Sequence, residues 1–96
     1  MISLPPDLDQ QFPSGQIVAT PNVLANILPE DIRKCLVRHF AGDWGECSEE
    51  DIESNNLALV DSGRLFSIYR SVNNVRFWII TEADRSATTV LLPEDY

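Results

Sequence analysis

Three side chains of this sequence are suited to acid–base or anion chemistry. His39 is the only histidine, and histidine can act as a general base near neutral pH. Arg85 could bind an anionic group through its planar guanidinium, and Thr88 could position that group. Equally, His39 lies on an apolar helical stripe and could be a buried structural residue. The segment 82–86 could also be a turn whose arginine pairs locally, so a catalytic and a structural interpretation both stay open.

A run of acidic residues offers a second type of site. Six acids and no Lys or Arg fall between positions 43 and 53, in a chain with a formal charge of −8. Such a run forms a solvated face, or an acidic surface that engages a basic protein groove or imitates a nucleic acid backbone. Trp44 within it either closes the core as a lid or stands exposed as an interaction anchor. The candidate protein-binding residues are Asp43, Trp44, Glu46, Glu49, Glu50, Asp51 and Glu53.

Composition argues against several classes of protein. One histidine without a cysteine at ligand spacing predicts no metal site, and no cofactor loop or serine hydrolase motif is present. The net negative charge disfavours direct DNA binding. Two cysteines favour reduced thiols, and no segment has the composition of a signal peptide or a membrane span. We therefore expect a cytoplasmic, membrane-free protein without a cofactor, and a non-enzymatic role is favoured.

The first half of the chain predicts helices. Prolines make residues 1–15 an extended arm, and residues 16–96 form a single α+β domain that opens with a short strand or extended lead at 16–19. Thr20 and Pro21 begin a helix that is buried through Val23, Leu24, Ile27 and Leu28. Pro29 begins a second helix, 29–41, whose core stripe is Ile32, Cys35, Leu36, His39 and Phe40. A third helix begins at Ser48 and runs to about Val60, with Asn56 lying among its core residues Ile52, Leu59 and Val60, and Gly63 is expected to close it in a left-handed conformation.

The second half predicts strands. The apolar period changes from 3.6 to 2 after Gly63, which indicates strands at 64–70, 75–81 and 87–92 with a tight turn at Asn73–Asn74. The predicted fold is α+β: two or three N-terminal helices packed on an antiparallel sheet of three strands, or four if 16–19 joins it. A chain of this kind could also be a subunit of a homodimer. An apolar patch around Phe66, Trp78 or Tyr96 would then lie on the free surface.

Three runs of sequence resemble a known family. They are HFAGDWG at 39–45, SGRL at 62–65 and TEADRSATTVLLP at 81–93. Together they are similar to a family of small uncharacterised bacterial proteins described as plasmid-related, and the likeness covers roughly residues 16–96. The family supplies no activity for any residue. The resemblance implies a bacterial or phage cytoplasm and a mobile-element setting.

Two functional hypotheses follow. The first is a non-enzymatic interaction protein of a mobile element, whose acidic segment binds a protein partner with a basic surface. That partner could be a host nucleic-acid defence complex such as a CRISPR effector, which the protein would inhibit. The alternative comes from the order of elements, which resembles barnase/RelE-like ribonucleases. It assigns RNA cleavage or binding to His39, Arg85 and Thr88, although most such toxins are basic.

Overall fold

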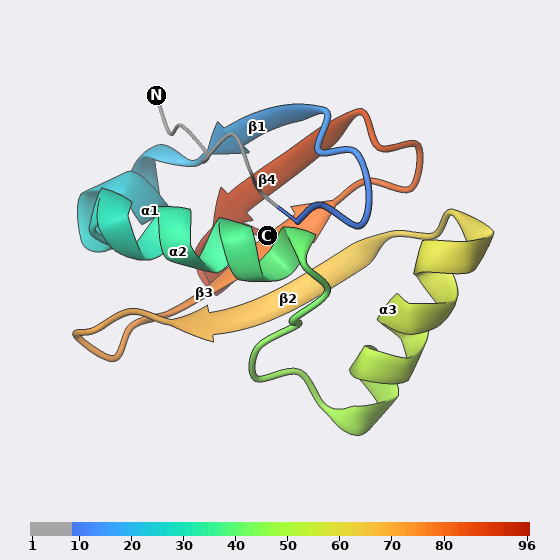
Figure 1. Ribbon diagram of the computed structural model, residues 1–96. Coiled ribbons are helices and arrows are strands. Elements are labelled where there is room, and N and C mark those ends of the chain that lie inside the picture. Colours follow the sequence, from blue (N-terminus) through green and yellow to red (C-terminus); the bar gives the residue numbers. More distant parts are fainter. Residues whose placement is uncertain (1–8) are drawn as a thin grey trace.

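The computed structural model describes residues 9–96, so residues 1–8 of the predicted arm lie outside the described part (Figure 1). The predicted α+β class is confirmed. In chain order the elements are β1 (Gln16–Ala19), α1 (Pro21–Asn26), α2 (Pro29–Phe40), α3 (Glu49–Asp61), β2 (Leu65–Arg70), β3 (Arg76–Thr81), β4 (Ala87–Leu91) and the 3₁₀ turn η1 (Pro93–Asp95).

The helices begin where capping chemistry predicts. The Thr20 hydroxyl accepts a hydrogen bond of 3.2 Å from the Val23 amide, and the Ser48 hydroxyl accepts one of 3.2 Å from the Asp51 amide. Pro21 and Pro29 occupy the first turns of α1 and α2, where a missing N–H costs nothing. The end of α3 differs from the prediction. Ser62, at φ 58°, adopts the left-handed conformation that was expected of glycine.

The sheet has four strands in the order β1-β4-β3-β2. The meander β2-β3-β4 is antiparallel, as predicted, but the expectation of a wholly antiparallel sheet was wrong because β1 pairs with β4 in parallel. A parallel pair needs a long crossover between its strands. Here the crossover is the whole chain from α1 to β3, and a local sequence pattern does not reveal such a pairing.

Helices α1 and α2 lie across one face of the sheet (Figure 1). The predicted stripe of α2 is buried there together with β2 and β3 residues such as Leu65 and Phe77. Of the apolar face predicted for the first helix, only half is buried: Val23 and Ile27 are, whereas Leu24 and Leu28 are 51% and 60% exposed. Among residues 9–96 no α-helix covers the opposite face of the sheet.

The third helix does not pack in the predicted way. Its buried residues are Asn55 and Ala58, whereas Ile52 and Leu59 are half-buried, Asn56 is exposed and Val60 is 82% exposed. The reason is where α3 sits. It lies beside the edge strand β2 instead of on a sheet face (Figure 1). Its contact with the strand is therefore made by a small residue, Ala58, and a hydrogen-bonding residue, Asn55, and not by a broad apolar stripe.

Asn55 replaces a neighbouring strand along the edge of β2. Its side-chain amide donates to the Phe66 carbonyl at 2.7 Å, and its side-chain oxygen accepts from the Phe66 amide at 3.0 Å. Further along the edge, Ile68 exchanges backbone hydrogen bonds with Trp44 and Glu46. Between them Gly45, at φ 70°, approaches so closely that a Cβ atom would lie 2.0 Å from the Ile68 carbonyl oxygen. Both contacts satisfy backbone groups that an open edge would leave free to pair with another chain.

We predict that Asn55→Ala lowers the free energy of unfolding by about 2 to 3 kcal/mol, because it leaves two backbone groups of β2 without partners. Urea denaturation measures the change. The matched control is Ser54→Ala, an exposed neighbour on the same helix, which should change stability by less than about 0.5 kcal/mol. Equal effects from the two substitutions would contradict this role of Asn55.

Candidate functional site

His39 lies in the core with no exposed surface. Its Nδ1 atom is 2.6 Å from the Ser67 hydroxyl and its Nε2 atom is 2.9 Å from the Thr81 hydroxyl. The Thr81 and Thr88 hydroxyls lie 2.8 Å apart, and Thr88 donates to the Ser14 carbonyl at 2.8 Å. One chain of hydrogen bonds therefore joins β2, α2, β3, β4 and the segment that precedes β1.

The proton positions in this chain follow from its end. A carbonyl only accepts, so Thr88 donates its single hydroxyl proton to Ser14, and Thr81 must donate to Thr88. Thr81 then accepts from the Nε2–H group of His39, and Nδ1 accepts from Ser67. The imidazole is thus neutral with its proton on Nε2. Burial, together with the charge of Arg85, lowers the pKa of His39 to about 3, which agrees with a neutral ring.

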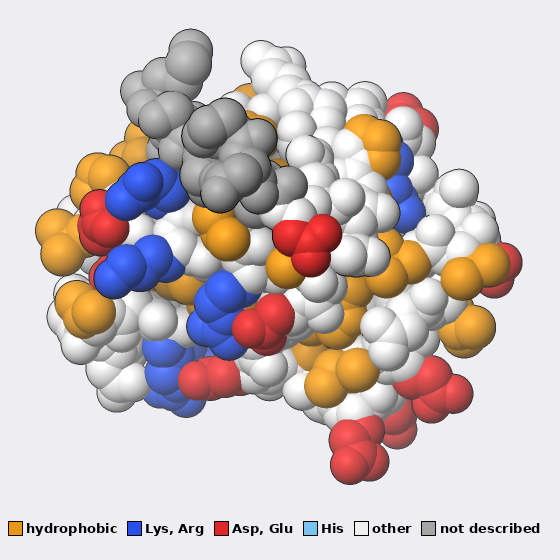
Figure 2. Space-filling model, in the orientation of Figure 1, with side chains coloured by type: hydrophobic (Ala, Val, Ile, Leu, Met, Phe, Trp, Pro, Cys, Tyr) orange, Lys and Arg blue, Asp and Glu red, His pale blue; other side chains and the backbone are white. Residues whose placement is uncertain are grey.

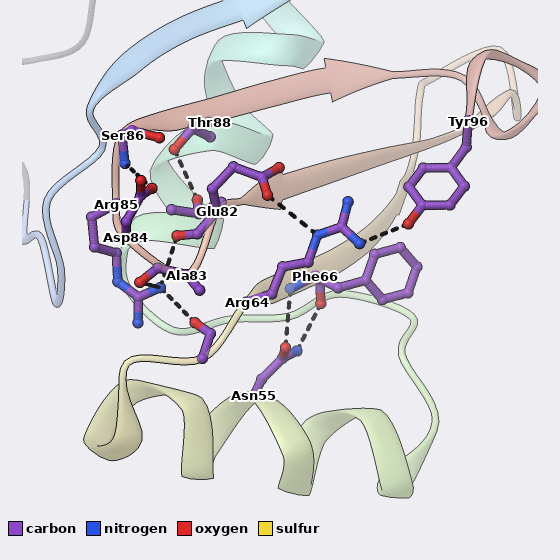
Figure 3. Close-up of polar contacts among 12 residues, drawn as sticks. Asn55, Arg64, Phe66, Glu82, Ala83, Asp84, Arg85, Ser86, Thr88 and Tyr96 are labelled. Atoms are coloured by element: carbon purple, nitrogen blue, oxygen red, sulfur yellow. Dashed lines mark hydrogen bonds and ion pairs between the residues drawn. The ribbon is translucent and has the colours of Figure 1, made fainter.

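Arg85 holds the end of α3. Its guanidinium donates to the carbonyls of Ala58 and Gly63 at 3.0 Å and 2.6 Å, and to the Glu82 carbonyl at 3.1 Å. Figure 3 shows the side chain turned toward the end of this helix. A cation is favourable there because the last carbonyls of a helix carry partial negative charge. Arg85 therefore joins the β3–β4 turn to α3.

The three candidate catalytic residues do not form an open site. His39 and Thr88 belong to one buried chain of hydrogen bonds, and both ring nitrogens of His39 have hydroxyl partners. The guanidinium of Arg85 is occupied by carbonyl oxygens, and its remaining face lies over the ring of Phe12 at 5.6 Å. All three side chains therefore have structural partners among the described residues.

The acidic segment divides into two parts. Trp44 is 4% exposed, so it is the core lid of the first interpretation, and its indole N–H donates to Asn56 at 3.1 Å. Asp43 pairs with Arg38 at 2.8 Å, and Glu46 pairs with Arg70 at 2.9 Å. These residues hold the loop against α2 and β2, which leaves the acids of α3 as the candidates for binding.

The outward face of α3 carries acids and apolar side chains together. Glu49, Glu50 and Glu53 are exposed, and no salt bridge involves them within residues 9–96. Leu57 and Val60 follow on the same side of the helix, 58% and 82% exposed. Figure 2 shows acidic side chains gathered over the start of α3, whereas Lys and Arg lie mainly over α2. The prediction that Val60 faces the core was wrong, and nothing in the sequence marked Leu57 as a surface residue.

A hollow lies on the sheet face that the α-helices leave uncovered. It has a volume of about 290 Å³ and is lined by Arg64, Phe66, Trp78, Ile80 and Tyr96. The rings of Phe66 and Trp78, and those of Trp78 and Tyr96, meet edge to face at 5.1 Å and 5.8 Å. Arg64 donates to the Tyr96 hydroxyl at 2.6 Å and lies 3.8 Å from Glu82 (Figure 3).

Comparison with known proteins identified no relative: no protein-family model, no curated protein and no solved structure matches the chain. The resemblance to plasmid-related proteins therefore stays a prediction. Within residues 9–96 no group of His, Cys, Asp or Glu is arranged to hold a metal ion, and no helix is long and apolar enough to cross a membrane.

We predict that His39 makes the free energy of unfolding depend on pH between about 5.5 and about 7.5, which is above the range in which carboxylates titrate. Its pKa is about 3 in the folded protein against 6.5 ordinarily, so only the unfolded chain takes up a proton in this window. The contribution of His39 is fully present above its ordinary pKa and is lost as the pH falls toward 3. From about pH 7.5 to about pH 5.5 the free energy of unfolding should fall by ~1.4 kcal/mol from this group.

Denaturation of the wild type and of His39→Gln at the two pH values measures this effect. The variant should be less stable at both, and its stability should change less between them. Nitrogen-15 NMR should show the Nε2–H form without titration over the same range. An imidazole that titrates near its ordinary pKa would contradict the assignment.

We also predict that Arg85→Ala lowers the free energy of unfolding by about 1 to 2 kcal/mol, because the part-buried carbonyls of Ala58 and Gly63 lose a charged donor. Thermal and urea unfolding measure the loss. Arg33→Ala is the control: Arg33 pairs with Glu30 on an exposed helix surface, and its removal should cost less than about 0.5 kcal/mol. A loss for Arg85→Ala as small as that of the control would show that Arg85 does not hold α3.

Proposed function

We propose that this chain is a small, non-enzymatic protein-binding domain whose binding surface is the outward face of α3. The observation that carries the proposal is that one helix face presents Glu49, Glu50 and Glu53 beside Leu57 and Val60. An apolar centre with charged neighbours is the usual composition of a protein interface. The partner expected for this face has a basic surface with an apolar depression.

A purely structural account explains only half of this face. Acids near the first turn of a helix are stabilised by the helix dipole, so Glu49 and Glu50 could serve α3 alone. That account gives no reason for Leu57 and Val60, two large apolar side chains that face solvent in the last two turns. Binding explains both groups. The acids would attract a basic partner over long range, and the apolar pair would be buried in the complex.

The mobile-element setting implied by the sequence resemblance suggests which partner to test first. We propose a bacterial protein complex that handles nucleic acid, such as a CRISPR effector, because such complexes carry extended basic grooves. An acidic helix could occupy a groove of this kind. The ribonuclease alternative is not carried forward, since His39, Arg85 and Thr88 all have structural partners.

Affinity measurements on purified candidate partners test the proposal. We expect the triple change Glu49→Lys, Glu50→Lys and Glu53→Lys to weaken binding at least about tenfold and to reduce its dependence on salt. Leu57→Ala with Val60→Ala should weaken binding without changing the salt dependence.

Glu94→Lys, which changes an exposed acid outside α3, is the matched control and should bind like the wild type. If a partner binds the triple Lys variant and the double Ala variant as tightly as it binds the wild type, the binding surface is not α3. Circular dichroism establishes that each variant is folded before its affinity is compared.

A further inference from the structure

Helix α3 is attached to the domain by little apolar packing. Helix α2, of 12 residues, buries six of them, whereas α3, of 13 residues, buries only Asn55 and Ala58. Ile52 and Leu59 add half-buried contacts with the core. Most of the stability of a protein helix comes from burial of its apolar face. The packing of α3 on the domain therefore stabilises this helix much less than the packing of α2 stabilises α2.

Side-chain hydrogen bonds supply the remaining attachment of α3. Within residues 9–96 they come from three residues. Asn55 bonds to the edge of β2, while Arg85 and Trp44 reach the helix from the β3–β4 turn and from the loop before it. All of these hydrogen bonds are only part-buried. Water can therefore replace the lost partners when the helix moves away, and hydrogen bonds of this kind add little net stability.

The segments at the two ends of α3 allow the helix to move as a unit. At its C-terminal end the chain turns through Ser62, at φ 58°, and Gly63. At its N-terminal end the loop stays with the sheet, because Trp44 is buried in the core and Glu46 is paired with β2. Hinges are often a few residues at the ends of elements. Rotation at 47–48 and at 62–63 would carry α3 away from β2 and leave the loop and the sheet in place.

The departure of α3 would bare one step of the edge of β2. Asn55 presents an amide where a neighbouring strand would present a peptide group, and it bonds both the N–H and the C=O of Phe66. Without it the Phe66 amide has no partner among the described residues, and the Phe66 carbonyl keeps only the Cys47 thiol at 3.3 Å. Ile68 keeps its hydrogen bonds to the loop. An unpaired strand edge can pair with an extended segment of another chain.

We propose that α3 is a latch on the edge of β2. In the native protein it opens as a unit while the sheet stays folded, and each opening frees the backbone N–H and C=O groups of Phe66. Proteins open in such cooperative units at free energies below that of global unfolding. The latch limits the time for which this edge is available to another chain. The device does not depend on the proposed function, because it uses the inward side of α3 and not its outward face.

Native-state hydrogen exchange, followed by NMR on the full chain at low urea concentrations, tests the latch. We expect the amides of α3, such as those of Leu59 and Val60, to exchange at least about tenfold faster than those of β3, such as Ile79 and Ile80. The Phe66 amide should exchange at the rate of α3. Exchange of these amides should also depend less on urea than exchange in β3, because opening exposes less surface than global unfolding.

The substitution Ile79→Val separates local opening from global unfolding. Ile79 is buried in β3, so this change weakens the sheet, which stays folded when α3 opens. The amides of β3 should then exchange roughly two- to tenfold faster, whereas the amides of α3 and of Phe66 should keep their wild-type rates. Asn55→Ala removes a contact of the closed latch and should speed exchange of both groups at least about tenfold. Ser54→Ala, an exposed neighbour, is the control and should change neither by more than about twofold.

Two outcomes would overturn the proposal. If Ile79→Val speeds the amides of α3 as much as those of β3, the helix opens only when the whole domain unfolds. If the amides of α3 exchange quickly while the Phe66 amide stays as slow as those of β3, the helix frays without releasing the edge. The measurements use the protein alone, so they are independent of the search for a partner of the outward face.

Discussion

The fold depends on one buried chain of hydrogen bonds. It begins at Ser67, passes through His39, Thr81 and Thr88, and ends at the carbonyl of Ser14. A buried polar group without a partner is costly, so each member needs the next one in place. The chain crosses every layer of the domain, since it joins a helix, three strands and the segment before β1. It therefore fixes how α2 lies on the sheet more tightly than apolar packing alone would do.

Local patterns in the sequence predicted most of the elements but fewer of their neighbours. Capping residues and prolines correctly marked the starts of the helices, and alternation correctly marked the meander. The parallel pairing of β1 with β4 joins residues about 70 positions apart, and no local period encodes it. The position of α3 was missed for a related reason. In the sequence, Asn55 is only a polar residue within a helix. Its role becomes clear when the edge of β2 is seen, because its side chain pairs with the backbone of Phe66 there.

The candidate site was predictable only in part. The acidic run was visible in the sequence, but the sequence did not show which of its acids form ion pairs. Glu46, for example, pairs with Arg70 only because the loop lies along β2. Trp44 could be a lid or an anchor until the core was seen. Leu57 and Val60 carried no sign of exposure, since apolar residues in a helix are expected to face inward. The exposure of these two side chains depends on which face of α3 packs against β2, and this packing is a property of the whole fold.

The manner in which α3 is attached has a mechanical consequence. Two polar side chains, Asn55 near its middle and Arg85 at its end, form the hydrogen bonds that fasten the helix to the sheet and to the β3–β4 turn. Apolar contact along the helix is limited to Ala58 and half-buried neighbours. A force applied through the outward face of α3 would reach the sheet through these two side chains and through the hydrogen bond from the Trp44 indole to Asn56. Under tension the helix should detach as a unit before the sheet opens, and the bare edge of β2 would then be available to pair with a strand from another molecule.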